Sequence, residues 1–471
     1  MRISLFLSLC IIGAGLITAA PVLAQDVDKE LHFNDLYRTG LNYTLQDFHR
    51  QTVTLGNRDF LAISLDHAGY VKMDEVGHPQ LPYLTESLMI PDTAKMEVRV
   101  LASEYEEYTN VALLPYRGPI PRTVDPNTVG YTFGDVYQVD AFFPGDVASL
   151  RDPFILRDVR GQVVEIFPFQ YNPVQKILRV YSNIQLEVVA NGVGEINVID
   201  RDLYGYKTDR SFTALYERSF PNYSAGAVQP SPLSTSGSRT EPPSEDGDML
   251  VICHGPFMAA MQPFVDWKNS IGISTTLVDV ATIGNNSTSI KNYITSVYNA
   301  GNLAYVLLVG DLNEIKSPSY AGGESDPTYS TITADWYPDL FVGRFSAQTV
   351  AHVDTQVQRT LEYEQQNHDL GADAWNAKGM GVASNQGSGI GHYGEGDNTH
   401  MNKIRSELLS YGFTTVDQIY DYSGTKAQVT SGLNNGRRIV NHCGHGSTTA
   451  WSSTGFNNND VNNLTNVGKL P

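Results

Sequence analysis

The sequence contains an uncharged, mostly aliphatic run at Ala304-Tyr305-Val306-Leu307-Leu308-Val309. A run of this length and composition is typical of a strand that is buried on both faces. Further apolar runs occupy residues 249–253, 340–342, 379–383 and 438–440, and stretches with a helical pattern lie between them at 257–269, 289–299, 350–365 and 400–410. The alternation of strand and helix predicts an α/β domain with a mostly parallel sheet and helices on both faces.

The part of the chain before this domain has a different pattern. From about residue 30 to 220, short alternating runs such as 96–100 and 184–188 are separated by Pro and Gly, which is typical of antiparallel strands. The stretch at 167–173 carries two prolines and is predicted as a turn. We therefore expect a β-rich, β-sandwich-like domain over residues 25–220, without a titratable cluster that indicates chemistry.

A change in composition separates the two predicted domains. Residues 221–247 are rich in Ser, Pro, Gly and Thr, which predicts a solvated linker before the α/β domain of residues 248–471. Arg239 is the only Lys or Arg between Arg218 and Lys268. It is therefore a candidate processing site for a protease with basic specificity. The alternative interpretation is a chance charge in a linker.

The N-terminus has the pattern of an export signal. Arg2 is followed by an apolar stretch over 5–17, which is too short to span a bilayer, and by a small-x-small cleavage site at 22–24. We expect residues 1–24 to be removed and the protein to be secreted or held at the cell surface. The remaining sequence has no apolar stretch of transmembrane length, so no transmembrane segment is expected after signal removal.

Charge and cysteine content exclude some classes of function. The chain has 471 residues, with 51 acidic and 32 basic side chains and a net charge of −19. Such a balance argues against nucleic acid as a partner, because binding to phosphates needs a basic face. Cys10 lies in the predicted signal, and Cys253 with Cys443 is too small a set for a disulfide framework.

One segment after a predicted strand carries residues suited to catalysis. The strand at 437–441 leads into His442-Cys443-Gly444-His445-Gly446-Ser447. Ligands of open parallel sheets bind beyond the carboxyl ends of the strands. Glycines on both sides of His445 allow a sharp turn that exposes the imidazole, and the Gly446 amide can face a reacting oxygen. A structural histidine is the competing interpretation.

Three other kinds of site use some of the same residues. A zinc site could recruit His442, Cys443, His445 and His400, but no paired-ligand spacing is present and strand alternation separates His442 from His445. A Cys443–His445 dyad would leave the two residues roughly 6.5 Å apart at Cα, too far for a direct hydrogen bond. The glycine-rich stretch at 387–391 lacks the spacing and the lysine of phosphate-binding loops, so nucleotide binding is not expected.

Several motifs in the second half of the chain occur together in a fixed order. They are Phe264-Val265-Asp266-Trp267-Lys268, residues 305–311, Phe341-Val342-Gly343-Arg344-Phe345, Gly394-Glu395-Gly396-Asp397, and Asn441 with Gly444-His445-Gly446-Ser447 and Thr449-Ala450-Trp451. With them, the stretch from Asp248 to Pro471 resembles the catalytic domain of the gingipain family, secreted bacterial cysteine peptidases with a caspase-like fold. The β-rich part, with Leu81-Pro82 and Ile90-Pro91, looks like the family's propeptide.

The resemblance implies a role for four residues. His445 matches the catalytic histidine that serves a cysteine thiolate as base and acid. Gly446 matches the residue whose amide helps to bind the oxyanion. Asp397 matches an aspartate at the floor of the substrate pocket in arginine-specific members, which implies cleavage after Arg. A helix N-terminal carboxylate is the competing interpretation of Asp397. Gln386 stands where the family has a glutamate that orients the histidine.

The nucleophile and the cofactors follow from the same resemblance. The family places its cysteine about thirty residues after the histidine, and only 26 residues follow His445, so the chain as given is expected to be a fragment that lacks the nucleophile and is inactive. No cofactor is expected for catalysis, although the resemblance implies structural calcium. Protein or peptide substrates are the expected partners, and the oligomeric state stays open. The alternative function is a non-catalytic surface or adhesion protein on the same scaffold.

Overall fold

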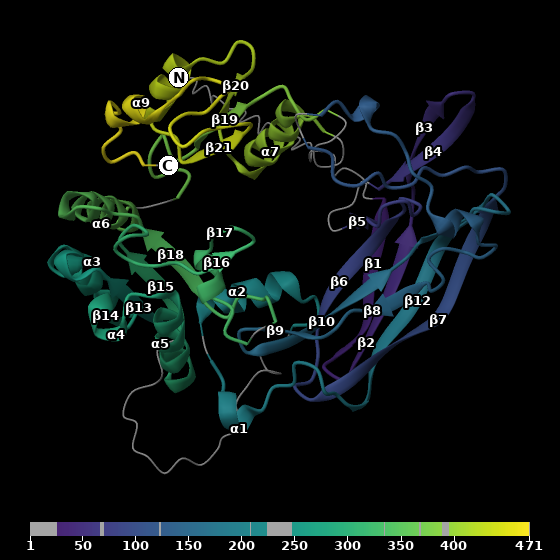
Figure 1. Cartoon of the computed structure of the whole chain (residues 1–471), viewed down its shortest axis with the longest axis horizontal. Coiled ribbons are helices and arrows are strands. Elements are labelled where there is room, and N and C mark those ends of the chain that lie inside the picture. Colours follow the sequence, from purple (N-terminus) through teal and green to yellow (C-terminus); the bar gives the residue numbers. More distant parts are fainter. Residues whose placement is uncertain are drawn as a thin grey trace, which may run out of the picture.

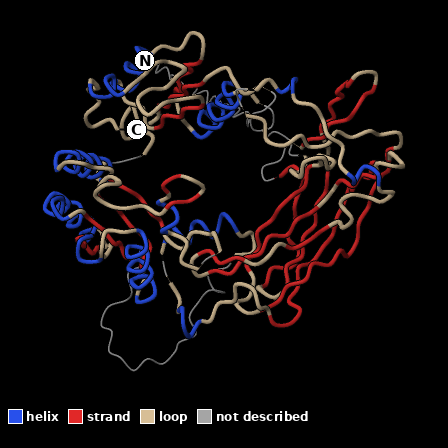
Figure 2. The backbone as a smooth tube through the Cα atoms, viewed as in Figure 1, coloured by secondary structure: helices blue, strands red, loops and turns tan. Residues whose placement is uncertain are grey.

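A computed structural model describes residues 26–65, 70–121, 124–207, 209–223, 247–333, 335–366, 369–388 and 395–470 (Figure 1). Strands are concentrated in the N-terminal segment, residues 26–223, and helices flank the strands in the rest of the chain (Figure 2). In the described ranges, none of the helices has the length and apolar character needed to cross a membrane. The predicted signal at residues 1–24 and the greater part of the predicted linker, Arg239 included, lie outside these ranges.

The N-terminal segment contains two five-stranded antiparallel sheets. The first has β1 (Val27–Asp35), β2 (Arg38–Leu45), β7 (Ala94–Tyr108), β11 (Phe169–Asn172) and β12 (Ile177–Val193). The second has β5 (Tyr70–Lys72), β6 (Pro82–Met89), β8 (Ala148–Leu150), β9 (Phe154–Leu156) and β10 (Val159–Ile166). A separate hairpin pairs β3 (His49–Leu55) with β4 (Arg58–Ser64).

The two sheets share one hydrophobic core, as a β-sandwich does. Leu41 and Ile184 from the first sheet pack in the same cluster as Leu88 and Val164 from the second. The predicted β-rich fold is confirmed. The predicted turn at 167–173 is wrong in its centre, because Phe169–Asn172 forms the buried strand β11, which pairs with β12. Pairing with β12 supplies the backbone hydrogen bonds of these residues, and it is invisible to local turn propensity.

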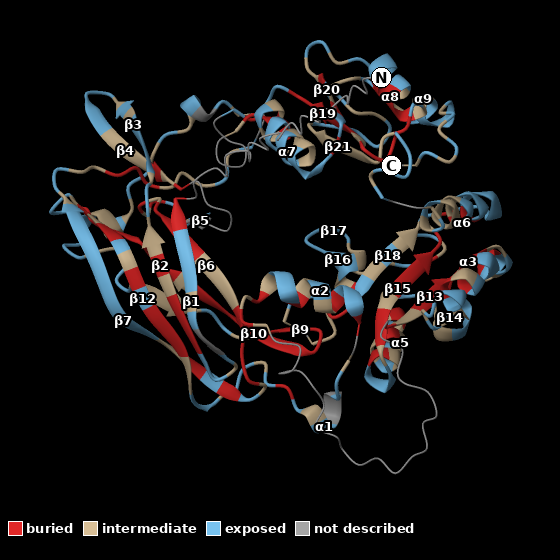
Figure 3. Cartoon of the chain, turned by 180° about the vertical axis from the view of Figure 1, so that it is seen from behind, coloured by how far each residue is buried: buried red, intermediate tan, exposed pale blue. Residues whose placement is uncertain are grey.

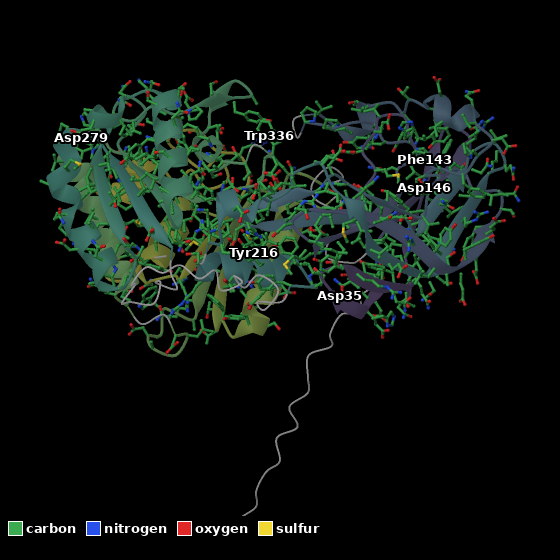
Figure 4. All side chains as sticks on the ribbon, turned by 90° about the horizontal axis from the view of Figure 1, so that it is seen from below. Asp35, Phe143, Asp146, Tyr216, Asp279 and Trp336 are labelled. Carbon is green, nitrogen blue, oxygen red and sulfur yellow. The ribbon has the colours of Figure 1, made fainter. Side chains whose placement is uncertain are left out.

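Two helices complete the N-terminal segment. They are α1 (Arg201–Tyr204) and α2 (Arg210–Ser219). The side chain of Asp209 caps α2 by accepting from the Phe212 amide. Phe212 and Tyr216 are buried on one face of α2, and Tyr216 lies where the N-terminal segment meets the α/β part of the chain (Figure 4).

The first α/β unit, residues 248–364, holds a four-stranded parallel sheet in the order β14-β13-β15-β18. Its elements are β13 (Asp248–Cys253), α3 (Met258–Ser270), β14 (Thr275–Asp279), α4 (Val280–Ile283), α5 (Ser287–Ala300), β15 (Leu303–Val309), β18 (Phe341–Phe345) and α6 (Val350–Glu364). A two-stranded ribbon of β16 (Ser319–Tyr320) and β17 (Gly323–Glu324) lies between β15 and β18 in the sequence.

Alternate residues of the central strands face different helices. Leu250 and Ile252 of β13 pack with Ile290 and Ile294 of α5 in one core. Val251 of β13 faces the other side, in a core that contains residues of α3 and α6. The buried strands β13 and β15 therefore lie between helices whose outer faces are exposed (Figure 3). This layering confirms the predicted parallel arrangement with helices on both faces.

The second α/β unit, residues 378–462, has its own three-stranded parallel sheet in the order β20-β19-β21. Its elements are β19 (Lys378–Ala383), α7 (Asp397–Tyr411), β20 (Thr415–Tyr420), α8 (Lys426–Asn434), β21 (Ile439–Cys443) and α9 (Asn458–Asn462). In the described part of the chain the α/β strands thus form two separate sheets, where the sequence predicts one. Hydrophobic runs predict that strands are buried, but they do not predict which strand edges pair.

Candidate active site

The candidate site lies at the carboxyl edge of the second parallel sheet. Ala383 at the end of β19 pairs in register with Cys443 at the end of β21. One residue further on, the amide of Ser384 donates to the carbonyl oxygen of Cys443 at 2.9 Å. The two segments that carry the predicted site residues therefore leave the sheet side by side. This is the edge at which open parallel sheets bind their ligands.

Asp397 is held at this edge by hydrogen bonds to Ser384 and Gln386. It is the first residue of α7, after the N-cap Gly396, and its exposed fraction is 2%. Its Oδ2 accepts a 2.6 Å hydrogen bond from Oγ of Ser384, and its amide donates to the Gln386 carbonyl at 2.8 Å. The N-terminal end of a helix also favours a negative charge. Both interpretations of Asp397, a pocket carboxylate and a helix-terminal one, fit this position.

The loop that carries His445 is a tight, hydrogen-bonded turn. The His445 carbonyl accepts from the Ser452 amide at 2.9 Å, and the Ser447 amide donates to Ala450 at 2.8 Å, so that Gly446 faces Trp451 in an isolated bridge. His445 itself is exposed. Among the described residues, nothing accepts a hydrogen bond from the Gly446 amide. The loop thus presents an accessible imidazole beside a free backbone donor.

Gly444 allows the loop to pass close to β19. A Cβ on Gly444 would lie 3.3 Å from Cβ of Ser384 and 3.6 Å from Nε2 of His442. Because β21 ends at Cys443, strand alternation does not extend to His445. The sequence argument that placed His442 and His445 on opposite faces therefore does not apply to the observed structure.

The predicted contact between Gln386 and His445 stays a prediction. The Gln386 side chain is exposed, and within the described ranges neither side chain forms a hydrogen bond. Gln386 forms two hydrogen bonds through its backbone. Its amide donates to Oγ of Ser384 at 3.1 Å, and its carbonyl oxygen accepts from the amide of Asp397. Gln386 therefore helps to hold Asp397 and the start of α7 beside the end of β19.

Ser384 and the placement of His442 are the features that sequence reasoning did not assign. The His442 ring stacks on Trp451, with centroids 4.6 Å apart and planes inclined by 10°. Burial lowers the pKa of His442, and the nearby Asp397 charge opposes this shift. Its Nε2 is buried without a hydrogen-bond partner in the described structure. In the sequence, the motif Thr449-Ala450-Trp451 was the only feature that pointed to the stacking of His442 on Trp451.

The two described cysteines have different surroundings. Cys253 at the end of β13 is 0% exposed, and its Sγ lies 3.3 Å from the carbonyl oxygen of His254. Burial, with a smaller effect of the Asp279 charge, raises the pKa of the Cys253 thiol to about 12. A thiol of this kind is protonated at neutral pH and is a poor nucleophile. Cys443 is partly exposed at the end of β21.

No metal centre is found at the residues that could have formed one. In the ranges that the structure describes, there is no cluster of three or more His, Cys, Asp or Glu side chains able to hold an ion. Nδ1 of His400, in α7, lies 3.3 Å from a carboxylate oxygen of Glu395, which precedes that helix by two residues. The glycine-rich stretch at 387–391 lies partly outside the described residues.

Comparison with protein families gives two matches along the chain. Residues 242–471 match the model of peptidase family C25, and residues 36–201 match the model of the C25 propeptide. The chain is similar to gingipain R1 and gingipain R2 of Porphyromonas gingivalis, each at 36% identity over 406 residues, or 85% of this chain. It spans 39% of the first relative's length and 53% of the second's.

Two solved structures also match, and the first of them is from Porphyromonas gingivalis. One is the complex of the RgpB pro- and mature domains, with 34% identity, a TM-score of 0.38, and coverage of 42% of this chain and 98% of that one. The other is the Arg-specific cysteine proteinase gingipain R, with 34% identity, a TM-score of 0.46, and coverage of 48% and 53%.

Proposed function

The chain belongs to peptidase family C25 and carries that family's propeptide region, and on this premise we propose that it is the zymogen of a secreted cysteine endopeptidase. The proposed substrates are proteins or peptides, and the proposed cleavage is after Arg. The observation that carries the proposal is the juxtaposition at the carboxyl edge of the second sheet. There, a buried carboxylate at Asp397 and the loop with His445 and Gly446 are tied together through Ser384.

The proposed mechanism assigns one step to each group. A cysteine thiol gives its proton to His445 and attacks the scissile carbonyl carbon, while the Gly446 amide stabilises the oxyanion. His445 then returns the proton to the leaving amine as the carbon–nitrogen bond breaks. Water hydrolyses the thioester by the same route and regenerates the thiol. Gln386 is proposed to accept from the imidazole N–H during these steps.

The specificity for Arg is proposed from the surroundings of Asp397. A carboxylate pairs with a guanidinium through two parallel hydrogen bonds, which a neutral side chain cannot reproduce. Gingipain R1 and R2 are among the relatives at 36% identity. The Lys-gingipain that also matches does so at 24% identity over 99% of this chain. Arg is therefore the better-supported preference.

The nucleophile is proposed to lie outside the residues that the structure describes. Cys253 is buried in the first α/β unit with a raised pKa, at the end of a different sheet from His445. Cys443 is half-buried at the end of β21 and precedes His445, whereas the family resemblance places the nucleophile after the histidine.

Export and maturation complete the proposal. We propose that residues 1–24 direct secretion and that the bond after Arg239 is cut during maturation. No cofactor is proposed for catalysis, and structural calcium is proposed without assigned ligands.

Replacing Arg239 by Ala in the protein expressed from its complete reading frame should leave an uncut zymogen. Normal processing of that variant would remove Arg239 as the site.

The test of the activity uses the processed protein from its complete reading frame and peptides with Arg, Lys or Ala before the cleaved bond. His445→Ala should lower kcat by roughly 100-fold or more. Asp397→Asn should raise KM for the Arg peptide and leave the Ala peptide unchanged. His352→Ala, on α6 of the other α/β unit, is the matched control. Absence of hydrolysis by the processed protein would favour the non-catalytic scaffold function.

A further inference from the structure

The N-terminal segment carries a buried arginine that does not bond to its own sheet. Arg157 lies in the two-residue turn between β9 and β10, where Leu156 pairs with Val159. Its exposed fraction is 3%, and its φ is +57°. A side chain in this backbone region is disfavoured, and turns of this kind usually place Gly or Asn there. The turn therefore keeps an arginine at a conformational cost.

The guanidinium of Arg157 crosses to the first α/β unit. Its Nη1 donates to the carbonyl oxygens of Leu303 at 2.7 Å and Asp339 at 3.1 Å. Its Nη2 donates to Oδ1 of Asn302 at 3.1 Å. The charge also lies 4.7 Å from the ring centroid of Phe212. In return, the Tyr298 hydroxyl donates to the Arg157 carbonyl at 3.0 Å.

A second buried arginine in the same hairpin gives an internal comparison. Arg160 is 1% exposed, and its guanidinium donates to the carbonyl oxygens of Pro91, Ala94, Ile196 and Asn197. All four acceptors belong to the N-terminal segment. Arg160 thus stabilises the fold of its own segment. Every side-chain hydrogen bond described for Arg157, in contrast, is made to the first α/β unit.

The acceptors of Arg157 define a surface at the amino ends of the parallel strands. Leu303 is the first residue of β15, and Asp339 lies two residues before β18 begins. We call the residues 298–303 and 337–341 the amino-end surface. It is separated from the carboxyl edge of its own sheet by the length of β15, roughly 20 Å for seven residues. The candidate active site is at the carboxyl edge of the other sheet.

Other contacts surround the arginine on this surface. Phe154 stacks on Tyr337 with centroids 4.0 Å apart, and Phe212 packs on Phe341 at 4.4 Å. Nζ of Lys207 donates to the carbonyl oxygen of Gly301 at 2.7 Å. These contacts enclose the guanidinium, which makes its hydrogen bonds stronger and the loss of either side more costly.

We propose that the amino-end surface is a docking site for the N-terminal segment, residues 26–223, and that Arg157 anchors this segment after the connection through residues 224–246 has been cut. The proposal rests on the proposed zymogen only in assuming such a cut. Because the acceptors of Arg157 belong to the first α/β unit and the candidate site is formed by the second, the anchor holds the propeptide on the peptidase domain without touching the catalytic residues. It thereby sets how long the cut propeptide stays bound.

The experiment measures dissociation and needs no enzyme activity. A recognition sequence for a site-specific protease is placed between residues 230 and 240 of the full chain, and the cut chain is followed by size-exclusion chromatography over a dilution series. The cut parent should elute as one complex. Arg157→Ala should weaken the association by roughly 100-fold or more, because it leaves two buried carbonyl oxygens and a half-buried amide oxygen without their donor.

The matched controls separate docking from folding. Arg151→Ala removes an arginine of the same segment that bonds to Glu165 and Tyr83 within it, and it should not change the association. Asn302→Ala removes an acceptor from the opposite side, and its effect should be much smaller when Arg157 is already absent. This second variant tests the anchor even if Arg157→Ala misfolds.

Two results would overturn the proposal. One is unchanged association of the cut Arg157→Ala chain with a native circular dichroism spectrum. The other is additive losses for Arg157→Ala and Asn302→Ala in the double variant. Failure of the peptidase proposal would instead appear as a lack of hydrolysis, with the association unaffected, so the two failures are distinguishable.

Discussion

Oγ of Ser384 donates a 2.6 Å hydrogen bond to Oδ2 of Asp397, and this bond joins the end of β19 to the first turn of α7. Both side chains are buried, with exposed fractions of 4% and 2%. A hydrogen bond to a buried carboxylate favours its ionised form and fixes its direction. Ser384 therefore orients the Asp397 carboxylate for an ion pair with a cationic group.

Replacing Ser384 by Ala should weaken the recognition of Arg substrates. Loss of one charge-assisted hydrogen bond corresponds to about 1.5–3 kcal/mol, so KM for an Arg peptide should rise roughly 10-fold or more, with little change in kcat. Steady-state kinetics on the processed protein measure this split. Ser388→Ala, an exposed serine in the same loop, is the control. An equal rise in KM for an Ala peptide would contradict the assigned role.

The pKa of His442 should fall further when Asp397 is neutralised. Burial holds this pKa below its ordinary value, and the Asp397 carboxylate raises it. Asp397→Asn removes the opposing effect, so the imidazole should protonate only at a lower pH than in the parent. NMR titration of the histidine ring signals measures the shift. Asp373→Asn, an exposed aspartate elsewhere, should leave the signal unchanged.

An upward shift of the His442 pKa in the Asp397→Asn variant would show that the carboxylate does not act on this ring. The direction of the change in the His442 pKa is therefore the informative result. Because the pKa is lowered in the folded state, neutral His442 is favoured at neutral pH, and the stacked contact with Trp451 does not depend on a positive charge there.

Cys253 should resist alkylation in the folded protein. Its thiol is buried and its pKa is raised to about 12, so the reactive thiolate is almost absent at pH 8. Iodoacetamide followed by peptide mass spectrometry should modify Cys443 first. In denaturant both cysteines should react at similar rates. Rapid modification of native Cys253 would restore it as a candidate nucleophile.

Asp339 should make the folded protein less stable as pH rises from about 4 to 6. Burial raises the pKa of Asp339 to about 6 from an ordinary value of 3.8, so the folded state holds the proton more tightly than the unfolded state. The contribution of this group is most favourable below pH 4 and is lost as the pH rises through 6. Above pH 6 both states are ionised and the dependence ends.

Asp339→Asn removes that dependence. The difference in the free energy of unfolding between variant and parent should shift in favour of the variant from pH 4 to 6 and then stay constant. Urea titrations of the 471-residue chain at several pH values measure it. The constant part of the difference reports the hydrogen bonds that the carboxylate accepts from the amides of Ile332 and Thr333. A difference independent of pH would contradict the raised pKa.

Local sequence patterns predicted the elements of the α/β part well. The apolar run at 304–309 lies in β15, and the helical pattern at 350–365 coincides with α6. Both predictions depend on the residues' own periodicity and burial, which act within a few turns of chain. The strands β14 and β20 have weaker runs and were not predicted, because no residue of β14 and only two of the six residues of β20 are fully buried.

The partners of the site residues could not be predicted in the same way. His445, Gly446 and Asp397 were assigned from motifs, whereas the Ser384 bond to Asp397 joins residues of two elements across a loop. No sequence pattern singled out Arg157. Its burial depends on carbonyl groups about 150 residues further along the chain.

The amino-acid sequence by itself determined the order of elements, the change from β-rich to α/β structure, and the motifs that carry the family. These depend on local composition and periodicity, which each segment contains. Only the tertiary structure decided that the parallel strands divide into two sheets, that Ser384 holds Asp397, and that Arg157 binds the amino ends of β15 and β18. Strand pairing and buried hydrogen bonds join distant residues, and their energies depend on a geometry that no single segment specifies.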